Sequence, residues 1–175
     1  MTTRYQHATL IDGTGAAPVP DAVLVVDDDG LIAYAGPAAT APPTPAATTA
    51  DLGGKTLLPG FFDCHAHLCM TPERGRIAGL AADRTVETFE IAGRPRATLD
   101  AGVTTQRDLG GVPAGHRTAL VVDDRLGSLE TGKTADFVVV VRDPLRDIAV
   151  LGSPENIVLV AQAGVVRKDL LGEIP

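Results

Sequence analysis

The residues with the clearest chemical potential lie in one short segment, residues 59–68, which reads Pro-Gly-Phe-Phe-Asp-Cys-His-Ala-His-Leu. Side chains two residues apart in an extended strand share a face, which predicts that Asp63, His65 and His67 project together. Imidazole is a common ligand of zinc and related transition metals, and two imidazoles fill only part of a shell of about four to six donors. The segment therefore predicts some of the ligands of a metal site, with the others supplied from elsewhere.

Other residues are candidates to complete that site with the two histidines. The candidate donors are Asp63, Cys69, Asp108 and His116. Three or four donors in total would suit zinc, and no other cofactor is expected. The alternative is that the two histidines have no such partners. Arg107 and Asp108 have an alternative of their own, a solvated ion pair of little energetic weight. The pattern assigns no catalytic residue.

Composition excludes several classes of function. The net charge of -7 in 175 residues argues against nucleic acid as a partner, because nucleic-acid binding needs an excess of Lys and Arg. Apolar runs such as residues 137–141 are too short to cross a bilayer, and the N-terminal residues do not read as a secretory signal. These features predict a cytoplasmic protein that binds neither nucleic acid nor membrane, with Cys64 and Cys69 as free thiols.

The chain reads mostly as strands, with one helical region in the middle. An apolar run after an acidic turn at Asp27-Asp28-Asp29-Gly30 predicts a hairpin, and the Ala/Pro/Thr tract over residues 38–50 predicts a surface loop. Residues 86–99 have helical spacing, with a break near Pro95 and a stop at Gly102. Strands are expected at residues 8–11, 22–26, 31–35, 55–58, 61–67, 103–108, 137–141, 157–161 and 165–166. Strand, helix and strand around residues 61–108 have the size of one βαβ unit.

Four segments together resemble a known family. They read Leu57-Leu58-Pro59-Gly60-Phe61-Phe62-Asp63-Cys64-His65-Ala66-His67, then Ala101-Gly102-Val103-Thr104-Thr105-Gln106-Arg107-Asp108-Leu109-Gly110-Gly111, then Leu126-Gly127-Ser128-Leu129-Glu130-Thr131-Gly132-Lys133-Thr134-Ala135-Asp136-Phe137-Val138-Val139, and Asp143-Pro144-Leu145. In this order they resemble the amidohydrolase superfamily of metal-dependent hydrolases. The branch that they resemble most includes imidazolonepropionase-like and Xaa-Pro dipeptidase-like enzymes.

The resemblance implies an α/β fold in two parts. A composite β-sandwich domain would come from both chain ends, residues 1–58 and 121–175, and residues 59–120 would form a βαβ remnant of a TIM-like barrel. In complete members the paired histidines join a carboxylated lysine, two further histidines and an aspartate around one or two divalent ions. Those ions activate a water that cleaves an amide-type C–N bond. The resemblance thus implies that His65 and His67 are metal ligands.

Most of the barrel that the resemblance implies is missing from the middle of the chain. A barrel of this kind needs about 250 residues, whereas only fourteen residues, 112–125, separate the second segment from the third. The remaining histidines are His7 and His116, and every lysine (Lys55, Lys133 and Lys168) falls in the predicted sandwich. The bridging lysine, the later histidines and the catalytic aspartate therefore have no counterpart here.

Two functions stay open from the sequence. One is a hydrolase of C–N bonds, inactive as a single chain and able to take a small amide substrate once its site is completed. The other is a non-catalytic truncated derivative, acting as a binding or assembly module or as half of a split enzyme. Two strands cannot close a barrel, so an exposed sheet edge is expected to favour a homo-oligomer or a complementary barrel chain as partner.

Overall fold

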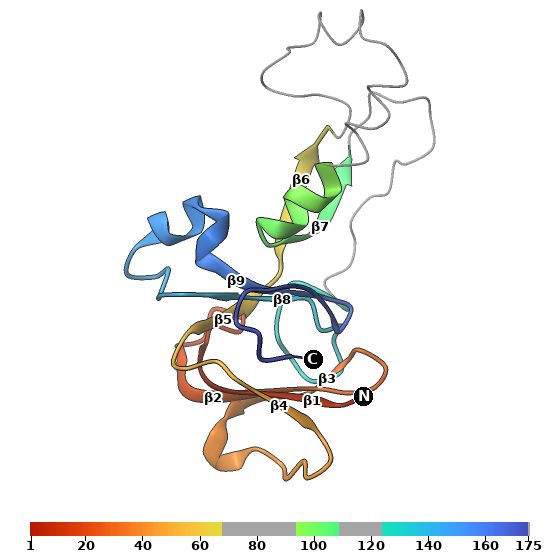
Figure 1. Ribbon diagram of the computed structural model, residues 1–175, viewed down its shortest axis with the longest axis vertical. Coiled ribbons are helices and arrows are strands. Elements are labelled where there is room, and N and C mark those ends of the chain that lie inside the picture. Colours follow the sequence, from red (N-terminus) through yellow and green to blue (C-terminus); the bar gives the residue numbers. More distant parts are fainter. Residues whose placement is uncertain (68–93, 109–123, 175) are drawn as a thin grey trace, which may run out of the picture.

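The computed structural model describes residues 1–67, 94–108 and 124–174, and this part of the chain is mostly sheet (Figure 1). Residues 94–100 form a helix, and three short 3-10 helices occur elsewhere in the described part. The elements are β1 (Thr3–Leu10), β2 (Val19–Val26), β3 (Ile32–Pro37), η1 (Ala38–Thr40), β4 (Thr48–Asp51), β5 (Thr56–Pro59), β6 (Phe61–Ala66), β7 (Val103–Asp108), β8 (Phe137–Val140), η2 (Ile148–Gly152), η3 (Pro154–Asn156), β9 (Ile157–Gln162) and β10 (Val165–Asp169).

Strands from both halves of the sequence share one sheet, which we call the composite sheet. Its order is β10-β9-β8-β5-β1-β2-β3, with β4 paired to β1. Strand β5 connects the two halves, because it runs parallel to β1 and antiparallel to β8, where Pro59 pairs with Phe137. Figure 1 shows β1, β2 and β4 in one layer and β8 and β9 in another. The two layers belong to one continuous hydrogen-bonded sheet. The predicted domain limits, residues 1–58 with 121–175 for the sandwich and 59–120 for the barrel remnant, stay a prediction.

Turn chemistry explains the hairpins. The Asp27 carboxylate accepts hydrogen bonds from the backbone N–H groups of Asp29 and Leu31 at 3.0 and 2.9 Å, and Gly30 has a φ of +78°. The acidic cluster is thus a turn, as its sequence predicts. Ala163 and Gly164 both have positive φ, which suits the tight hairpin between β9 and β10.

The segment predicted as a surface loop, residues 38–50, holds two elements instead. Strand β4, which begins in this segment and ends at Asp51, pairs parallel to β1, with Thr3 opposite Thr48 and Gln6 opposite Asp51. The prediction was wrong there because a strand of four residues, Thr-Thr-Ala-Asp, has no hydrophobic alternation that could reveal it.

Strand β8 is buried on both faces and separates two apolar cores. Phe137 and Val139 belong to the larger core, where the Phe137 ring meets the Tyr5 ring edge-on at 4.9 Å. Val138 and Val140 belong to a smaller core on the other face. A strand covered on both sides needs an uninterrupted aliphatic sequence, which is what Phe-Val-Val-Val supplies.

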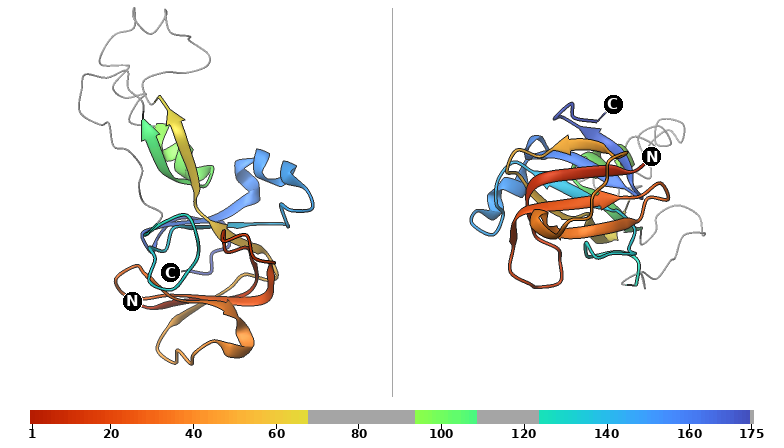
Figure 2. Two further views of the ribbon diagram at one scale, coloured as in Figure 1. Left: turned by 180° about the vertical axis from the view of Figure 1, so that it is seen from behind. Right: turned by 90° about the horizontal axis from the view of Figure 1, so that it is seen from below.

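The smaller core connects the composite sheet to the part made of β6, the helix at residues 94–100 and β7, which we call the β6–β7 unit. Phe61 and Leu99 of this unit pack against the smaller core. Gln162 Nε2 donates a hydrogen bond to the Thr104 carbonyl at 2.7 Å. The described part of the unit therefore packs on the composite sheet, on the side away from the β1–β2 layer (Figures 1 and 2).

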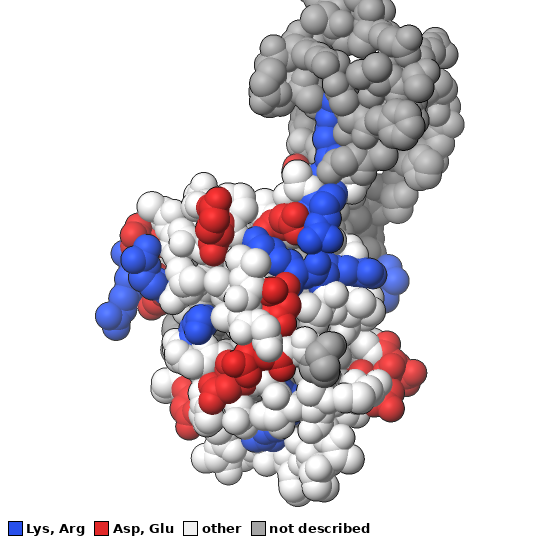
Figure 3. All heavy atoms as spheres, in the orientation of Figure 1, with Lys and Arg blue, Asp and Glu red and all other residues white. Residues whose placement is uncertain are grey.

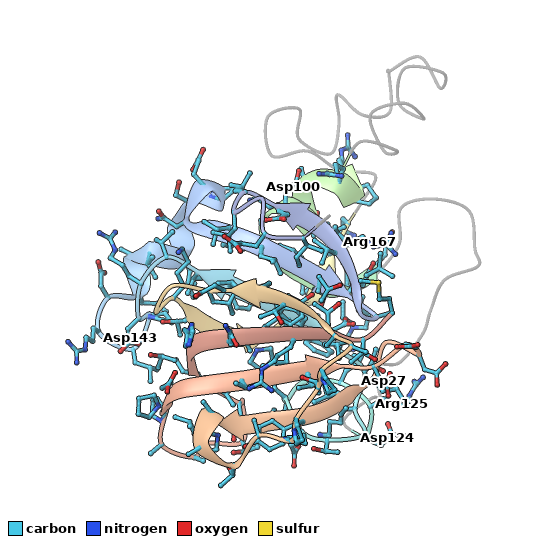
Figure 4. All side chains as sticks on the ribbon, turned by 60° about the horizontal axis from the view of Figure 1, so that its bottom comes forward. Asp27, Asp100, Asp124, Arg125, Asp143 and Arg167 are labelled. Atoms are coloured by element: carbon cyan, nitrogen blue, oxygen red, sulfur yellow. The ribbon has the colours of Figure 1, made fainter. Side chains whose placement is uncertain are left out.

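The end of the helix is held by a lysine from the composite sheet. Lys168 Nζ in β10 donates to the carbonyl oxygens of Asp100 and Pro154, at 2.8 and 2.6 Å. Figure 4 shows Asp100 where the helix lies above the sheet, and Lys and Arg side chains gather in this region of the face seen in Figure 3. Gly102, with a φ of +84°, ends the helix as its sequence predicts. In the described residues we find no helix with the length and apolar character needed to span a bilayer.

Candidate functional site

The candidate site lies on β6, which pairs parallel with β7. The register places Phe62 opposite Thr105, Asp63 opposite Gln106 and Ala66 opposite Asp108. Between the last two of these pairs β6 advances three residues while β7 advances two, so Cys64 and His65 together face Arg107. Two residues opposite one define a β-bulge, and bulges often re-aim side chains next to functional sites.

The bulge changes the face pattern expected from strict alternation. Cys64 and His65 are both exposed, whereas Ala66 is only 6% exposed. The imidazoles of His65 and His67 nevertheless lie next to each other, with ring centroids 5.2 Å apart and planes at 66°. The structure thus brings the two predicted metal ligands together, although the strand that carries them is not regular.

Two side chains bind the backbone of the bulge. The Asp63 carboxylate accepts a hydrogen bond from the His65 N–H at 3.0 Å. Arg107 Nε donates to the Cys64 carbonyl at 2.7 Å, across from β7. Asp63 was a candidate metal ligand and Arg107 half of a candidate ion pair, but the structure gives both a contact with the bulge that sequence spacing could not reveal.

The described residues fit a divalent metal ion only in part. His65 and His67 supply two imidazoles, a suitable pair of ligands for zinc and its neighbours. Within residues 1–67, 94–108 and 124–174 no group of three or more His, Cys, Asp or Glu gathers around one point. Asp108 ends β7 in register with Ala66, one residue before His67. The other candidate donors, Cys69 and His116, lie outside the described residues.

A buried carboxylate supports the start of β6. Asp136 is 7% exposed, and its carboxylate accepts a hydrogen bond from the Ala163 N–H at 2.7 Å. Its backbone carbonyl accepts from the Gly60 N–H at 2.9 Å, directly before β6. Burial raises the pKa of the Asp136 carboxyl above its ordinary value. Asp136 therefore joins the β9–β10 turn to the point where β6 leaves the composite sheet.

A polar cluster precedes β8 in the loop after residue 124. Lys133 Nζ donates to Ser128 Oγ at 2.7 Å and lies 2.9 Å from the Glu130 carboxylate, which also accepts a hydrogen bond from Ser128. The Ser128 hydrogen bond, followed by Lys133, lowers the pKa of Glu130. Each partner lies within five residues of the others, so the cluster shapes its own loop.

Several solved structures with similar folds are hydrolases or peptidases by name. Molinate hydrolase is 32% identical over 61% of this chain and 23% of its own, with a TM-score of 0.52. A Xaa-Pro dipeptidase with methionine bound in its active site superposes over 96% of this chain and 100% of its own, with a TM-score of 0.74. Its sequence identity is 11%, so this likeness concerns the fold alone.

Curated relatives decide the family. The imidazolonepropionase of Micrococcus luteus is 34% identical over 140 residues, which cover 79% of this chain and 29% of the relative. That of Pseudomonas putida is 37% identical over 107 residues, 56% of this chain and 26% of the relative. The chain belongs to the amidohydrolase superfamily.

This amidohydrolase-superfamily chain is much shorter than its curated relatives. It spans less than a third of the length of the two imidazolonepropionases above, 29% and 26%. No family model matches it. Members of the superfamily generally use divalent metal ions, which agrees with a histidine pair on β6, and zinc stays a prediction for this chain.

Proposed function

We propose that this chain carries two metal ligands and the composite sheet of a hydrolase that cleaves C–N bonds. We propose further that it is inactive until additional ligands complete its metal site. The observation that carries the proposal is the His65–His67 pair, with ring centroids 5.2 Å apart, on a strand that pairs parallel with β7. A divalent ion bound there would supply an activated water and polarise a carbonyl. The role of His65 and His67 is to hold that ion as two of its ligands.

The names of the relatives suggest the substrate class. Imidazolonepropionase is the name shared by curated relatives, and molinate hydrolase and a phenylurea hydrolase are among the similar structures. We therefore propose a small amide, urea or cyclic amide as the substrate of the completed site. Imidazolonepropionate, N-acyl amino acids and dipeptides are the first compounds to test.

A second candidate function is non-catalytic. The observation in its favour is that the described residues bring together no third ligand beside the two histidines. The larger core contains no residue of the β6–β7 unit, so the composite sheet has an interior of its own. In this role the chain would be a binding or assembly module, with a second copy or a complementary barrel chain as its partner.

Metal content separates the two functions. We expect the purified full-length chain to bind one equivalent of zinc or cobalt weakly, and His65→Ala and His67→Ala to abolish this binding. His7→Ala is the matched control, because His7 pairs with Asp51 at 2.9 Å in the composite sheet. Binding that survives both site substitutions would exclude the proposed pair. Turnover of any test substrate by the pure chain, lost in His65→Ala, would exclude the non-catalytic role.

A further inference from the structure

The bulge in β6 leaves backbone groups without their usual partners in the ladder between strands. A bulge of two residues opposite one interrupts the regular N–H to C=O pairing of the two strands. The interruption falls on Cys64 and His65, between Asp63 and Ala66. A backbone group in such a position needs another partner, and here side chains of the chain itself supply it.

Both partners come from residues that flank the bulge. Arg107 stands on β7 directly across from Cys64 and His65, and its Nε donates to the Cys64 carbonyl at 2.7 Å. Asp63 precedes the bulge, and its Oδ1 accepts from the His65 N–H at 3.0 Å. A charged donor and a charged acceptor make stronger hydrogen bonds than neutral groups do. Both polar groups of the peptide between Cys64 and His65, the Cys64 C=O and the His65 N–H, are therefore hydrogen-bonded to side chains.

The peptide held in this way carries the first imidazole of the pair. His65 lies inside the bulge and His67 beyond it, so the bulge sets how far the first ring turns toward the second. The observed arrangement has ring centroids 5.2 Å apart and planes at 66°. The two hydrogen bonds thus act directly on the backbone of His65, whereas His67 follows the Ala66–Asp108 pair.

We propose that Arg107 and Asp63 are positioning residues that hold the β6 bulge and thereby orient the His65 imidazole toward that of His67. The consequence for metal binding depends on the proposed function, whereas the orientation of the rings does not. Asp63 acts here through the backbone N–H of His65. Arg107 acts through the carbonyl of Cys64.

The first test uses the metal-free full-length chain with labelled histidine. The four histidine rings are assigned from single His→Gln variants, and the NOE between the ring protons of His65 and His67 reports their separation. We expect this NOE in the wild type, its loss or marked weakening in Arg107→Met and Asp63→Ala, and its recovery in Arg107→Lys. Lysine keeps the positive charge and N–H donors that methionine lacks, so recovery shows that a charged donor is needed and not only a long side chain.

Arg96→Met is the matched control within the same β6–β7 unit. Its guanidinium pairs with Asp100 at 3.0 Å within the helix, so its loss should leave the NOE unchanged. An undiminished NOE in Arg107→Met, or no NOE in the wild type, would overturn the proposal. Should Arg107→Met fail to fold by circular dichroism, Asp63→Asn, which keeps an oxygen acceptor, and Asp63→Ala form the deciding pair.

The second test measures cobalt binding by its visible absorption. Residues that orient metal ligands typically change affinity by about 10- to 100-fold, so Arg107→Met should weaken cobalt binding at least tenfold and alter the absorption bands. A wild type that binds no cobalt would defeat the proposed function, while the NOE test of Arg107 would stand. If the wild type and Arg107→Met bind cobalt with equal affinity and equal spectra, the positioning role of Arg107 is wrong, while the proposed function is unaffected.

Discussion

Single polar side chains hold the backbone at the places where the two parts of the molecule meet. Lys168 donates to two carbonyls at the helix end and at η3, Gln162 to the Thr104 carbonyl, and Asp136 accepts from the Ala163 N–H. Each contact satisfies a backbone group that lies outside a regular ladder. Substitution at these positions should therefore affect the junction more than the strands themselves.

Asp136 makes the stability of the protein depend on pH. Because burial raises its folded-state pKa, the folded protein binds this proton more tightly than the unfolded chain does. The resulting stabilisation is complete below the unfolded pKa and is lost as the pH rises through the folded pKa. Asp136→Asn stays neutral and keeps an oxygen for the Ala163 N–H. We expect its free energy of unfolding, relative to wild type, to increase from about pH 3 to pH 7 in urea titrations.

A difference between wild type and Asp136→Asn that stays constant across this pH range would contradict the interpretation. Asp136→Ala provides the control for the hydrogen bond. It also removes the titrating group but leaves the Ala163 N–H without its acceptor, which should cost about 1–3 kcal/mol at every pH.

Gly60 has no room for a side chain. A Cβ at this position would overlap the Thr104 hydroxyl and lie 2.6 Å from its methyl group, and Thr104 is only 6% exposed. Gly60→Ala should therefore lower the free energy of unfolding by about 1–3 kcal/mol, as overpacking does. Gly152→Ala is the matched control, because a Cβ there meets no atom within 4 Å. Chemical denaturation of both variants checks this, and equal stabilities would contradict it.

At the scale of elements, the sequence predicts the strands that have strong apolar patterns. Residues 137–140 and 157–161 are uninterrupted apolar runs, and both form buried strand segments. The β6 bulge was beyond prediction, because its partner Arg107 is 42 residues from His65 in sequence and only the strand register reveals it. The histidine pair could be predicted from its spacing and from the family resemblance. Its supporting side chains could not.

Lys168 should control the local stability of the helix at residues 94–100. Lys168→Met keeps the alkyl chain but loses the ammonium that donates to the Asp100 and Pro154 carbonyls. Hydrogen bonds to charged groups contribute about 1.5–3 kcal/mol, so amide exchange at the end of this helix should accelerate roughly tenfold or more. Amides of β1 and β2 should be unaffected in the same hydrogen-exchange experiment.

Lys55→Met is the control for that experiment. Lys55 Nζ donates to the Leu52 carbonyl at 3.3 Å, in the turn between β4 and β5 of the composite sheet. Its loss should leave helix exchange as in the wild type. Unchanged helix exchange in Lys168→Met would show that the lysine hydrogen bonds contribute little and that the other contacts of the unit, such as the packing of Leu99, hold the helix.

At the scale of the whole molecule, the composite sheet should fold without the β6–β7 unit. The larger core draws only on residues of the sheet and its loops, among them Tyr5 and Phe137. A variant in which a short Gly-Ser linker replaces residues 61–123 should therefore unfold cooperatively in urea. It loses Phe61 and Leu99 from the smaller core, and large core truncations cost about 2–5 kcal/mol each.

The same variant should also self-associate, because the face formed by Leu58, Val138 and Val140 would no longer be covered. Size-exclusion chromatography with light scattering checks this. A monomeric variant as stable as the wild type would show that the β6–β7 unit contributes little to the smaller core. An unfolded variant would show that the larger core alone does not suffice.

The pairing of Pro59 with Phe137 bears on how such a chain can arise. The chain leaves strand β5 after Pro59 and pairs with it again at Phe137 in β8, so the segment between these two residues closes one loop. The entropy of closing a loop rises only with the logarithm of its length, by about 0.6 kcal/mol per doubling. Between a middle segment of this size and one with a complete barrel, the sheet would differ by about 1 kcal/mol in closure entropy. A large internal deletion can therefore remove an enzyme's catalytic interior in one genetic event while the protein that remains still folds.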